Sequence, residues 1–496
     1  MKIMKEKRRV VKRVTKINSS KDKKIQIRNL FVLAKGHFQK WLWGSGVIVG
    51  LALIFLLPGT RETDWFKQIG LISLVILSVF VLFIYLRRFW PEFLLSRPLS
   101  LLGILIVSMA AIGKVIILLP QVPDYFIPIA FLSILVSLLF TPVLSAIITL
   151  LLVILFAVNT QNLGILPILT IGGMVGAYTA SFIHQRTDLT KGGLYVGISN
   201  VLAILAVGLV GNHSLSYILT MSLWGIGSGF FSSILVMAVL PYLETYFGIT
   251  TDIRLLELGN LNLPLLNRLT IEAPGTYYHT IMVASLAEAG ADAIGANSLL
   301  VRIGAYYHDI GKIVRPHFFF ENAGSSENNH HQKVTPNLSS VIIISHLKDG
   351  VEMAQDNRLP QVIIDIIREH HGTGLIAHFY REALLKGDKK NKELIGEENF
   401  RYPGPKPQSK EAAIVMLADS VEADFRFLPR RNIKSIETQV GKVIGNKLRD
   451  GQLDECDLTL REIAKITQAF SRTLAGVVHT RGRYPEEMLK KESKIG

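Results

Sequence analysis

Histidine and aspartate gather in one stretch of this 496-residue chain. Nine of the thirteen histidines fall between residues 279 and 378. A single buried histidine is more often a hydrogen-bonded core residue than a metal ligand. Five separate places beside apolar helices are harder to explain in that way, because a buried ionisable group is costly unless it is paired or metal-bound. The residues in these places are His279, His308, Asp309, His346, His370, His371 and Asp419.

These side chains are of the types that bind divalent cations. Imidazole and carboxylate ligands without cysteine suit Fe, Mn, Zn, Co or Ni. They are too many for one tetrahedral ion, whereas two ions about 3.5–4 Å apart, bridged by one carboxylate, would use them. Such a centre activates water and stabilises the attacking and leaving oxygens of a phosphoryl displacement. The pattern therefore favours phosphoester hydrolysis with two divalent metal ions as cofactors.

Nearby basic residues have two interpretations. Lys312 stands three residues after Asp309, close enough to meet a phosphate, although a lysine at a helix end is more commonly solvated. Arg315 is equally ambiguous. His330 and His331 lie in a polar loop, where we expect them to be solvated.

Apolar segments with helical spacing must position these residues. After about residue 255 charged residues become frequent, and no run alternates convincingly with the period of two that a strand requires. We expect loops over 322–336 and 387–408. The single cysteine, Cys456, excludes an internal disulfide framework. The fold class predicted is all-α, with helices over 280–294, 298–311, 359–372 and 409–423, the last with Ser409 as its N-cap.

The first half of the chain reads as a membrane-spanning helical bundle. Hydrophobic residues make up 49% of the sequence, and apolar runs of about 20 residues can cross a bilayer core of roughly 30 Å. The fourth and fifth runs are split only by Thr141 and Pro142. We expect about eight spans, over 41–59, 69–86, 99–120, 125–140, 142–158, 163–182, 192–211 and 217–247.

The net charge of +15 is concentrated in the N-terminal tail. Residues 1–29 contain twelve Lys or Arg against Glu6 and Asp22, a net of +10. Beside a membrane span, such a tail more often marks the cytoplasmic side and contacts anionic lipid than it binds nucleic acid. We therefore expect the lipid bilayer as a partner, no polymeric nucleic acid, and both termini in the cytoplasm.

Longer segments carry a family resemblance. The order of the histidines and aspartates resembles the HD phosphohydrolase superfamily. The segments "LLELGNLNLPLLNRLTIEAPGTYYHT", "GAYYHDIGKIVRPHFFFEN", "DGVEMA", "HHGTG" and "FRYPGPKPQSKEAAIVMLADSVEA" resemble the PgpH-type membrane HD phosphodiesterases. The resemblance runs from about Trp41 to Glu486 and is dense from 255 to 424. It implies a multi-pass enzyme of the bacterial cell membrane that hydrolyses cyclic di-AMP to linear pApA with iron or manganese.

The resemblance also implies a role for each site residue. One metal ion would be held by His279, His308, Asp309 and Asp419. The second would be held by Asp309, His346 and His370, with Asp309 as the bridge. His371 would be a neighbouring ligand or a phosphate contact, and Lys312 would face the substrate phosphate. The implied domains are a basic tail over 1–40, a transmembrane bundle over 41–248, a connector over 249–270, an HD domain over 271–486 and a charged tail over 487–496.

Departures from the family pattern leave alternatives open. Only residues 60–68 stand where the family has a large extracytoplasmic domain, and the loop at 323–333 differs from the usual wording. The Gly-Tyr-Pro triplet of the cyclic di-GMP branch is missing. The alternatives are hydrolysis of another nucleotide, such as cyclic di-GMP or a guanosine alarmone, and a non-catalytic nucleotide-binding membrane receptor. The oligomeric state is not fixed by the sequence, and a homodimer is one option.

Overall fold

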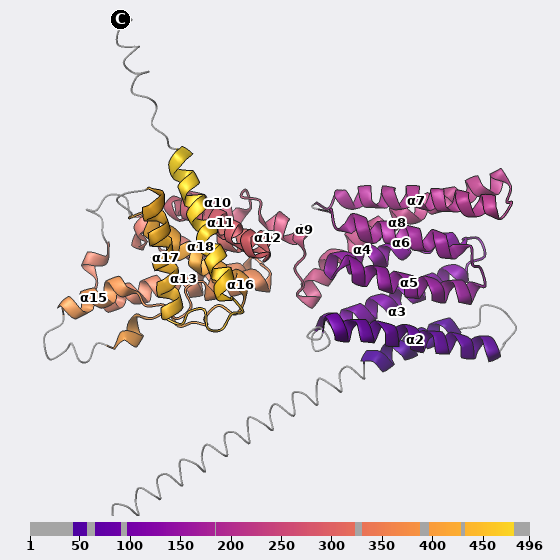
Figure 1. The fold of residues 1–496 in the computed structure, drawn as a ribbon, viewed down its shortest axis with the longest axis horizontal. Helices are drawn as coiled ribbons and strands as arrows, with labels where there is room; N and C mark the ends of the chain where they lie inside the picture. The colour runs from indigo at the N-terminus through magenta and orange to yellow at the C-terminus, as the bar shows by residue number, and fades with distance from the viewer. Residues whose placement is uncertain are drawn as a thin grey trace, which may run out of the picture. The chain divides into compact units, whose positions relative to one another are not determined.

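A computed structural model describes residues 43–56, 65–90, 97–183, 185–322, 330–386, 396–427 and 432–480. The chain divides between Thr251 and Asp252 into two compact units, which we describe one by one (Figure 1). The predicted tails at 1–40 and 487–496 lie outside the described residues, as do parts of the predicted loops over 60–68, 323–333 and 387–408.

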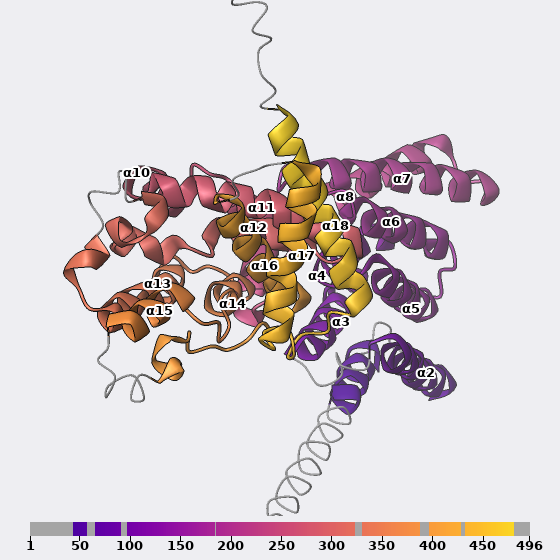
Figure 2. The ribbon, with the colours of Figure 1, turned by 60° about the vertical axis from the view of Figure 1, so that its left-hand side comes forward.

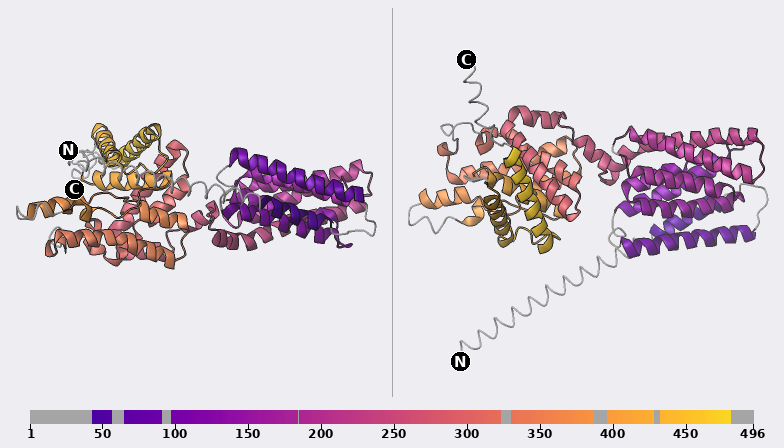
Figure 3. Two further views of the ribbon diagram at one scale, coloured as in Figure 1. Left: turned by 90° about the horizontal axis from the view of Figure 1, so that it is seen from below. Right: turned by 45° about the horizontal axis from the view of Figure 1, so that its top comes forward.

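The first unit consists of apolar helices that run side by side (Figures 1 and 3). Contacts join α4 to α5 and α6, and α6 to α7, which packs along α8. The elements are Trp43–Leu56, α2 (Trp65–Phe89), α3 (Arg97–Ile117), η2 (Asp124–Phe126), α4 (Ile129–Leu139), α5 (Pro142–Thr160), α6 (Ile165–Ala180), α7 (Asp188–Val210) and α8 (Leu215–Phe247).

Five of these helices are long and apolar enough to cross a membrane: α2, α3 from Pro98, α5, α7 and α8. The other three are shorter. The 11 residues of α4 rise only about 17 Å, less than a bilayer core of roughly 30 Å. The break expected between the fourth and fifth runs is present, because the Thr141 hydroxyl accepts a hydrogen bond from the Leu144 amide and Pro142 starts α5. Eight separate crossings stay a prediction.

The second unit is helical throughout its described residues, which contain one isolated β-bridge, Leu375 to Arg401, and no strand. The all-α prediction is confirmed for these residues. The elements are α9 (Asp252–Leu258), α10 (Pro264–Glu272), α11 (Pro274–Ile294), α12 (Ser298–Tyr307), η3 (Ile310–Val314), η4 (Pro316–Phe318), η5 (Phe320–Asn322), η7 (His330–Lys333), α13 (Pro336–Asp356), α14 (Gln361–Glu369), α15 (Ala377–Lys386), η9 (Glu397–Phe400), α16 (Lys410–Phe425), α17 (Ile433–Arg449) and α18 (Leu460–Thr480).

Helix α16 is the central element of this unit. It contacts α11, α12, α14 and α17, and Figure 2 shows it among these helices. The run from Ala412 to Asp419 is buried on every side, which suits a core helix. Its start is as predicted, because the Ser409 hydroxyl accepts a hydrogen bond from the Ala412 amide at 3.1 Å.

Two predicted helix ends were wrong. The helix expected over 298–311 ends at Tyr307, and the chain turns at His308 and Asp309 into η3. The turn brings Gly311 against α13, where a Cβ atom on Gly311 would clash with the carbonyl oxygen of His346. The helix expected over 359–372 ends at Glu369, and Gly372 takes a left-handed φ of 54°. Both endings place histidine or aspartate at a helix terminus.

The expected connector contributes to the core of the second unit. Leu255, Leu258, Leu266 and Leu269 from α9 and α10 are buried against Tyr307 and its neighbours. Tyr307 also donates a hydrogen bond from its hydroxyl to the Leu258 carbonyl oxygen at 2.9 Å. These helices therefore support the chain where it turns toward His308 and Asp309.

Candidate metal centre

The predicted site residues converge in the second unit, although they come from five helical segments. His279 lies within α11, and His346 lies within α13. His308 and Asp309 join α12 to η3, His370 and His371 follow α14, and Asp419 lies in α16. Their ligand atoms form two groups, each with all its atoms within 4.8 Å of one another. The groups are Asp309, His346, His370 and His371, and His279, His308 and Asp419.

Asp309 stands between the two groups. Its Oδ2 atom lies 3.2 Å from His308 Nε2 and 3.5 Å from His279 Nε2. Its Oδ1 atom lies 3.5 Å from His346 Nε2 and 3.7 Å from His370 Nε2. Each carboxylate oxygen therefore faces the histidines of one group, the arrangement that a bridging carboxylate requires.

Three of the histidines are oriented by their own backbone. The Nδ1 atoms of His308, His346 and His370 lie 2.5–2.8 Å from the carbonyl oxygens three residues earlier, at Ala305, Ile343 and Ile367. Because a carbonyl oxygen only accepts, each Nδ1 atom carries the proton, and each Nε2 atom of a neutral ring presents a lone pair. Histidines that bind metal ions are commonly oriented in this way, with the other ring nitrogen donating to a carbonyl or carboxylate oxygen.

The Nε2 lone pairs of these three histidines face the negatively charged carboxylate of Asp309. The buried Nε2 atoms of His308, His346 and His370 and Oδ1 of Asp309 have no hydrogen-bond partner among the described residues. A lone pair on nitrogen and a carboxylate oxygen repel each other at these distances, and a buried unpaired polar atom is costly. Cations between them would satisfy all four atoms. The residues present therefore fit a pair of divalent metal ions.

The electrostatics favour the protonation states that metal binding needs. Burial lowers the pKa of His346 to about 4, and it also lowers the pKa values of His370 and His371. Burial alone would raise the pKa of Asp309, but its contacts with the His308 ring and with the charged Lys312 ammonium hold it well below the usual value. The rings of His346, His370 and His371 are thus neutral at neutral pH, beside an ionised carboxylate.

His279 is held by a carboxylate that we did not predict. Its Nδ1 atom lies 2.5 Å from Glu422 Oε2, and its Nε2 atom lies 3.0 Å from Asp419 Oδ1. Burial would lower the pKa of His279, but the hydrogen bonds to Asp419 and Glu422 raise it to about 9. Glu422 also accepts hydrogen bonds from Arg426 Nε at 2.8 and 2.9 Å. Because Glu422 is three residues after Asp419, both lie on one face of α16. Asp419 is a proposed metal ligand, and Glu422 orients a second one, His279.

We expect Glu422→Gln to weaken metal binding roughly 10- to 100-fold, the usual effect of removing a carboxylate that hydrogen-bonds to a metal-binding histidine. The amide cannot carry the charge that fixes His279 with its proton on Nδ1. Metal affinity is measured by competition with a coloured chelator. The exposed Glu437 on α17 offers the control Glu437→Gln. Wild-type affinity in Glu422→Gln would show that Glu422 does not orient a metal ligand.

Lys312 lies deeper in the site than a solvated lysine would. Its Nζ atom lies 2.6 Å from Asp309 Oδ2 and 2.7 Å from Glu321 Oε1. Burial would lower the pKa of Lys312, but these two carboxylates raise it, so the ammonium stays charged. Glu321, which we did not predict, is held in turn by the Thr276 hydroxyl at 3.2 Å.

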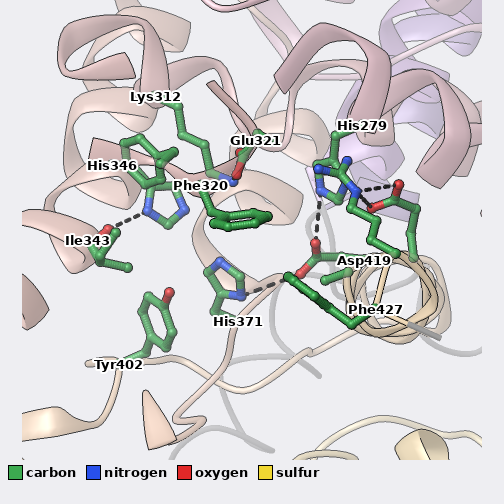
Figure 4. A pocket seen from close by; sticks show the side chains of 14 residues that line it. His279, Lys312, Phe320, Glu321, Ile343, His346, His371, Tyr402, Asp419 and Phe427 are labelled. Atoms are coloured by element: carbon green, nitrogen blue, oxygen red, sulfur yellow. Dashed lines mark hydrogen bonds and ion pairs between the residues drawn. The ribbon is translucent and has the colours of Figure 1, made fainter. Parts of the chain in front are cut away.

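His371 and Tyr402 line the open side of the site (Figure 4). The His371 Nδ1 atom lies 3.6 Å from Asp419 Oδ2, and its ring stacks on Tyr402 with the centroids 4.3 Å apart. A cavity of about 220 Å³ opens here, and Lys312 and Phe427 also line it.

Arg315, His330 and His331, the other basic residues considered from the sequence, lie outside the two ligand groups. Arg315, left ambiguous by the sequence, donates to Asp349 at 2.6 Å. The expectation for His330 and His331 was wrong, because both are half-buried and pack against Phe318. His331 also contacts the Phe318 carbonyl oxygen through Nε2 at 2.7 Å.

Two family models match the chain. "7TM receptor with intracellular HD hydrolase" matches residues 65–251, and "HD domain" matches residues 276–424. A curated relative, the cyclic-di-AMP phosphodiesterase PgpH of Bacillus subtilis (strain 168), is 47% identical over 322 residues, which are 64% of this chain and 44% of the relative. PgpH of Listeria monocytogenes serotype 1/2a (strain 10403S) is 41% identical over 331 residues, covering 66% of this chain and 45% of the relative.

The chain thus spans less than half the length of these curated relatives. A solved structure, the L. monocytogenes PgpH HD domain in complex with cyclic-di-AMP, is 46% identical and has a TM-score of 0.41, over 45% of this chain and all of that one. The two family models cover the two units in the order expected of one architecture. Over these two segments the chain is similar to membrane proteins in which a 7TM-type helical part precedes an HD hydrolase domain.

Proposed function

We propose that the chain is a membrane-bound, metal-dependent phosphodiesterase that hydrolyses cyclic di-AMP to linear pApA and so lowers the level of this second messenger. The observation that carries the proposal is the position of Asp309 between two groups of ligand atoms. The substrate is taken from the curated relatives, which are named cyclic-di-AMP phosphodiesterases.

In this proposal His279, His308, Asp309 and Asp419 hold one divalent ion. Asp309, His346 and His370 hold the other, with Fe or Mn as the metal. When bound, such a pair supplies an activated water and neutralises charge on the phosphoryl group. His371 stands at the ligand groups and on the cavity wall, which supports a role as a further ligand or as a phosphate contact. The ammonium of Lys312 faces the same cavity, which supports its contact with a phosphate oxygen.

We also propose that the first unit anchors the enzyme in the bacterial cell membrane with both termini in the cytoplasm. The support is the lysine and arginine of the segments at 86–97 and 184–191, which together with the basic tail favour the cytoplasmic side, and the apolar helices of this unit. The substrate would then be hydrolysed at the inner face of the membrane. Cysteine labelling of the loop at 212–214 from outside intact cells, compared with the loop at 185–187, tests this orientation.

The activity is tested on the full chain in detergent. The protein is stripped with a chelator, reloaded with Mn²⁺ or anaerobic Fe²⁺, and incubated separately with cyclic di-AMP, cyclic di-GMP and a guanosine tetraphosphate. Chromatography should show linear pApA from the first only after reloading, and elemental analysis should show two metal ions per chain. No pApA under either metal, or faster turnover of another nucleotide, would overturn the proposed substrate.

A further inference from the structure

Two aromatic side chains stand exposed at the mouth of the cavity. Phe320 lies in η5 and is 72% exposed, and Phe427 follows α16 and is 65% exposed. They are more than 100 residues apart in sequence, yet their rings contact each other with centroids 5.3 Å apart and planes tilted by 46°. Figure 4 shows both rings beside the histidine groups. The described residues of the second unit expose one other tyrosine or phenylalanine to this extent, Tyr278.

The pair differs from an ordinary core contact, because the fold leaves most of each ring in water. Exposed phenylalanine forfeits the free energy that its burial would contribute. The described residues around the pair hide neither ring, although both line a cavity whose floor is polar. Exposed apolar surface rimmed by polar residues is typical of a binding site.

The distance between Phe427 and the proposed metal ligand Asp419 suits contact with a base of the substrate rather than with its phosphate. Phe427 is eight residues after Asp419, which places its backbone about 12 Å further along the axis of α16 if the helical rise continues. The cavity, at about 220 Å³, is smaller than the roughly 300–1,000 Å³ that encloses a drug-sized ligand. A cyclic dinucleotide with its phosphate at the polar floor must therefore extend past the rim, where these rings stand.

We propose that Phe320 and Phe427 form a stacking surface for an adenine base of the substrate, an inference that rests on the proposed function. The base would stack on the outward faces of the rings. Inserting it between them would need a separation of about 7 Å, two layers of van der Waals contact, which exceeds 5.3 Å. Stacking accepts any base, so these residues set affinity for a nucleotide and not the choice of adenine over guanine.

The first test is a separation of KM from kcat in the full chain. Phe320→Ala and Phe427→Ala should each raise KM for cyclic di-AMP roughly 5- to 100-fold, the range of base–aromatic stacking, while kcat changes little. Phe427→Leu should behave like Phe427→Ala, whereas Phe427→Tyr should retain the wild-type KM. Leu460, which is 72% exposed at the start of α18, supplies the control Leu460→Ala. A wild-type KM in both alanine variants, or full rescue by leucine, would overturn the stacking role.

A second test observes stacking without turnover. The five tryptophans of the chain all lie at or before residue 224, so Phe427→Trp adds the first one to the second unit. In metal-stripped protein, cyclic di-AMP or AMP should quench this added fluorescence beyond the wild-type background, and ribose 5-phosphate should not. If wild-type protein fails to hydrolyse cyclic di-AMP, the proposed function fails, and quenching by adenine nucleotides still decides the role of the rings. Absence of quenching at ligand concentrations that saturate the protein would contradict it.

Discussion

Asp309→Asn should lower turnover of cyclic di-AMP by about 10³-fold or more, because one side chain serves both groups of ligands. Asparagine keeps the shape but replaces one charged oxygen with an amide nitrogen that cannot bind a metal ion. Elemental analysis should find fewer than two ions per chain. Asp365, a residue of α14 whose side chain is 39% exposed and accepts a hydrogen bond from Gln361, offers the matched control Asp365→Asn.

Melting temperatures of Asp309→Asn with and without metal should distinguish a loss of metal binding from a loss of folding stability. In the metal-free protein the new amide can donate to a histidine Nε2 atom that has no partner, and Lys312 loses Asp309 but keeps its ion pair with Glu321, so the melting temperature in chelator should stay close to that of wild type. Metal at 100 times its dissociation constant should stabilise wild type by about 2.7 kcal/mol and the variant by much less. Turnover within about tenfold of wild type would remove Asp309 from its proposed role.

The metal ligands could be predicted because they are ionisable side chains on or beside strongly apolar helices. Histidine and aspartate beside apolar helices, such as Asp419 in the buried run of α16, indicate a need for a partner even when the partner is unknown. The helix ends at Tyr307 and Glu369 could not be placed, because they depend on tertiary contact. The close approach of Gly311 to the backbone of His346 ends one helical pattern that local sequence would continue.

The supporting residues were harder to predict. Glu422 had a local signal, since an acid one turn after Asp419 on an apolar helix also needs a partner. Its partner His279 is 143 residues away in sequence, and no spacing rule connects them. Glu321 and the pair Phe320 and Phe427 had no comparable signal, because their roles arise from segments that meet only in the folded unit.

Lys312→Met should lower turnover roughly 10²- to 10³-fold, the effect of removing one charged group that stabilises the transition state. The metal content of this variant should stay at two ions per chain. The substitution removes none of the proposed metal ligands, and it also removes a cation that competes with the metal ions for Asp309. Turnover falls in both variants, and the metal content separates this variant from Asp309→Asn, which should hold fewer than two ions per chain. Turnover within about threefold of wild type would show that Lys312 does not contact the phosphate.

The melting temperature of the same variant should show the second role of Lys312, which is to neutralise the charge of Glu321. The substitution leaves Glu321, whose side chain is only 11% exposed, near Asp309 without its cation, and breaking a buried pair costs about 3–5 kcal/mol. For a unit of this size the melting temperature should fall by roughly 6–20 °C. The double variant Lys312→Met, Glu321→Gln removes the unpaired charge as well, so it should regain most of the stability and none of the turnover. Recovery of turnover in the double variant would mean that Lys312 serves only to neutralise Glu321, and the proposed phosphate contact would have to be assigned to another residue of the cavity, such as His371.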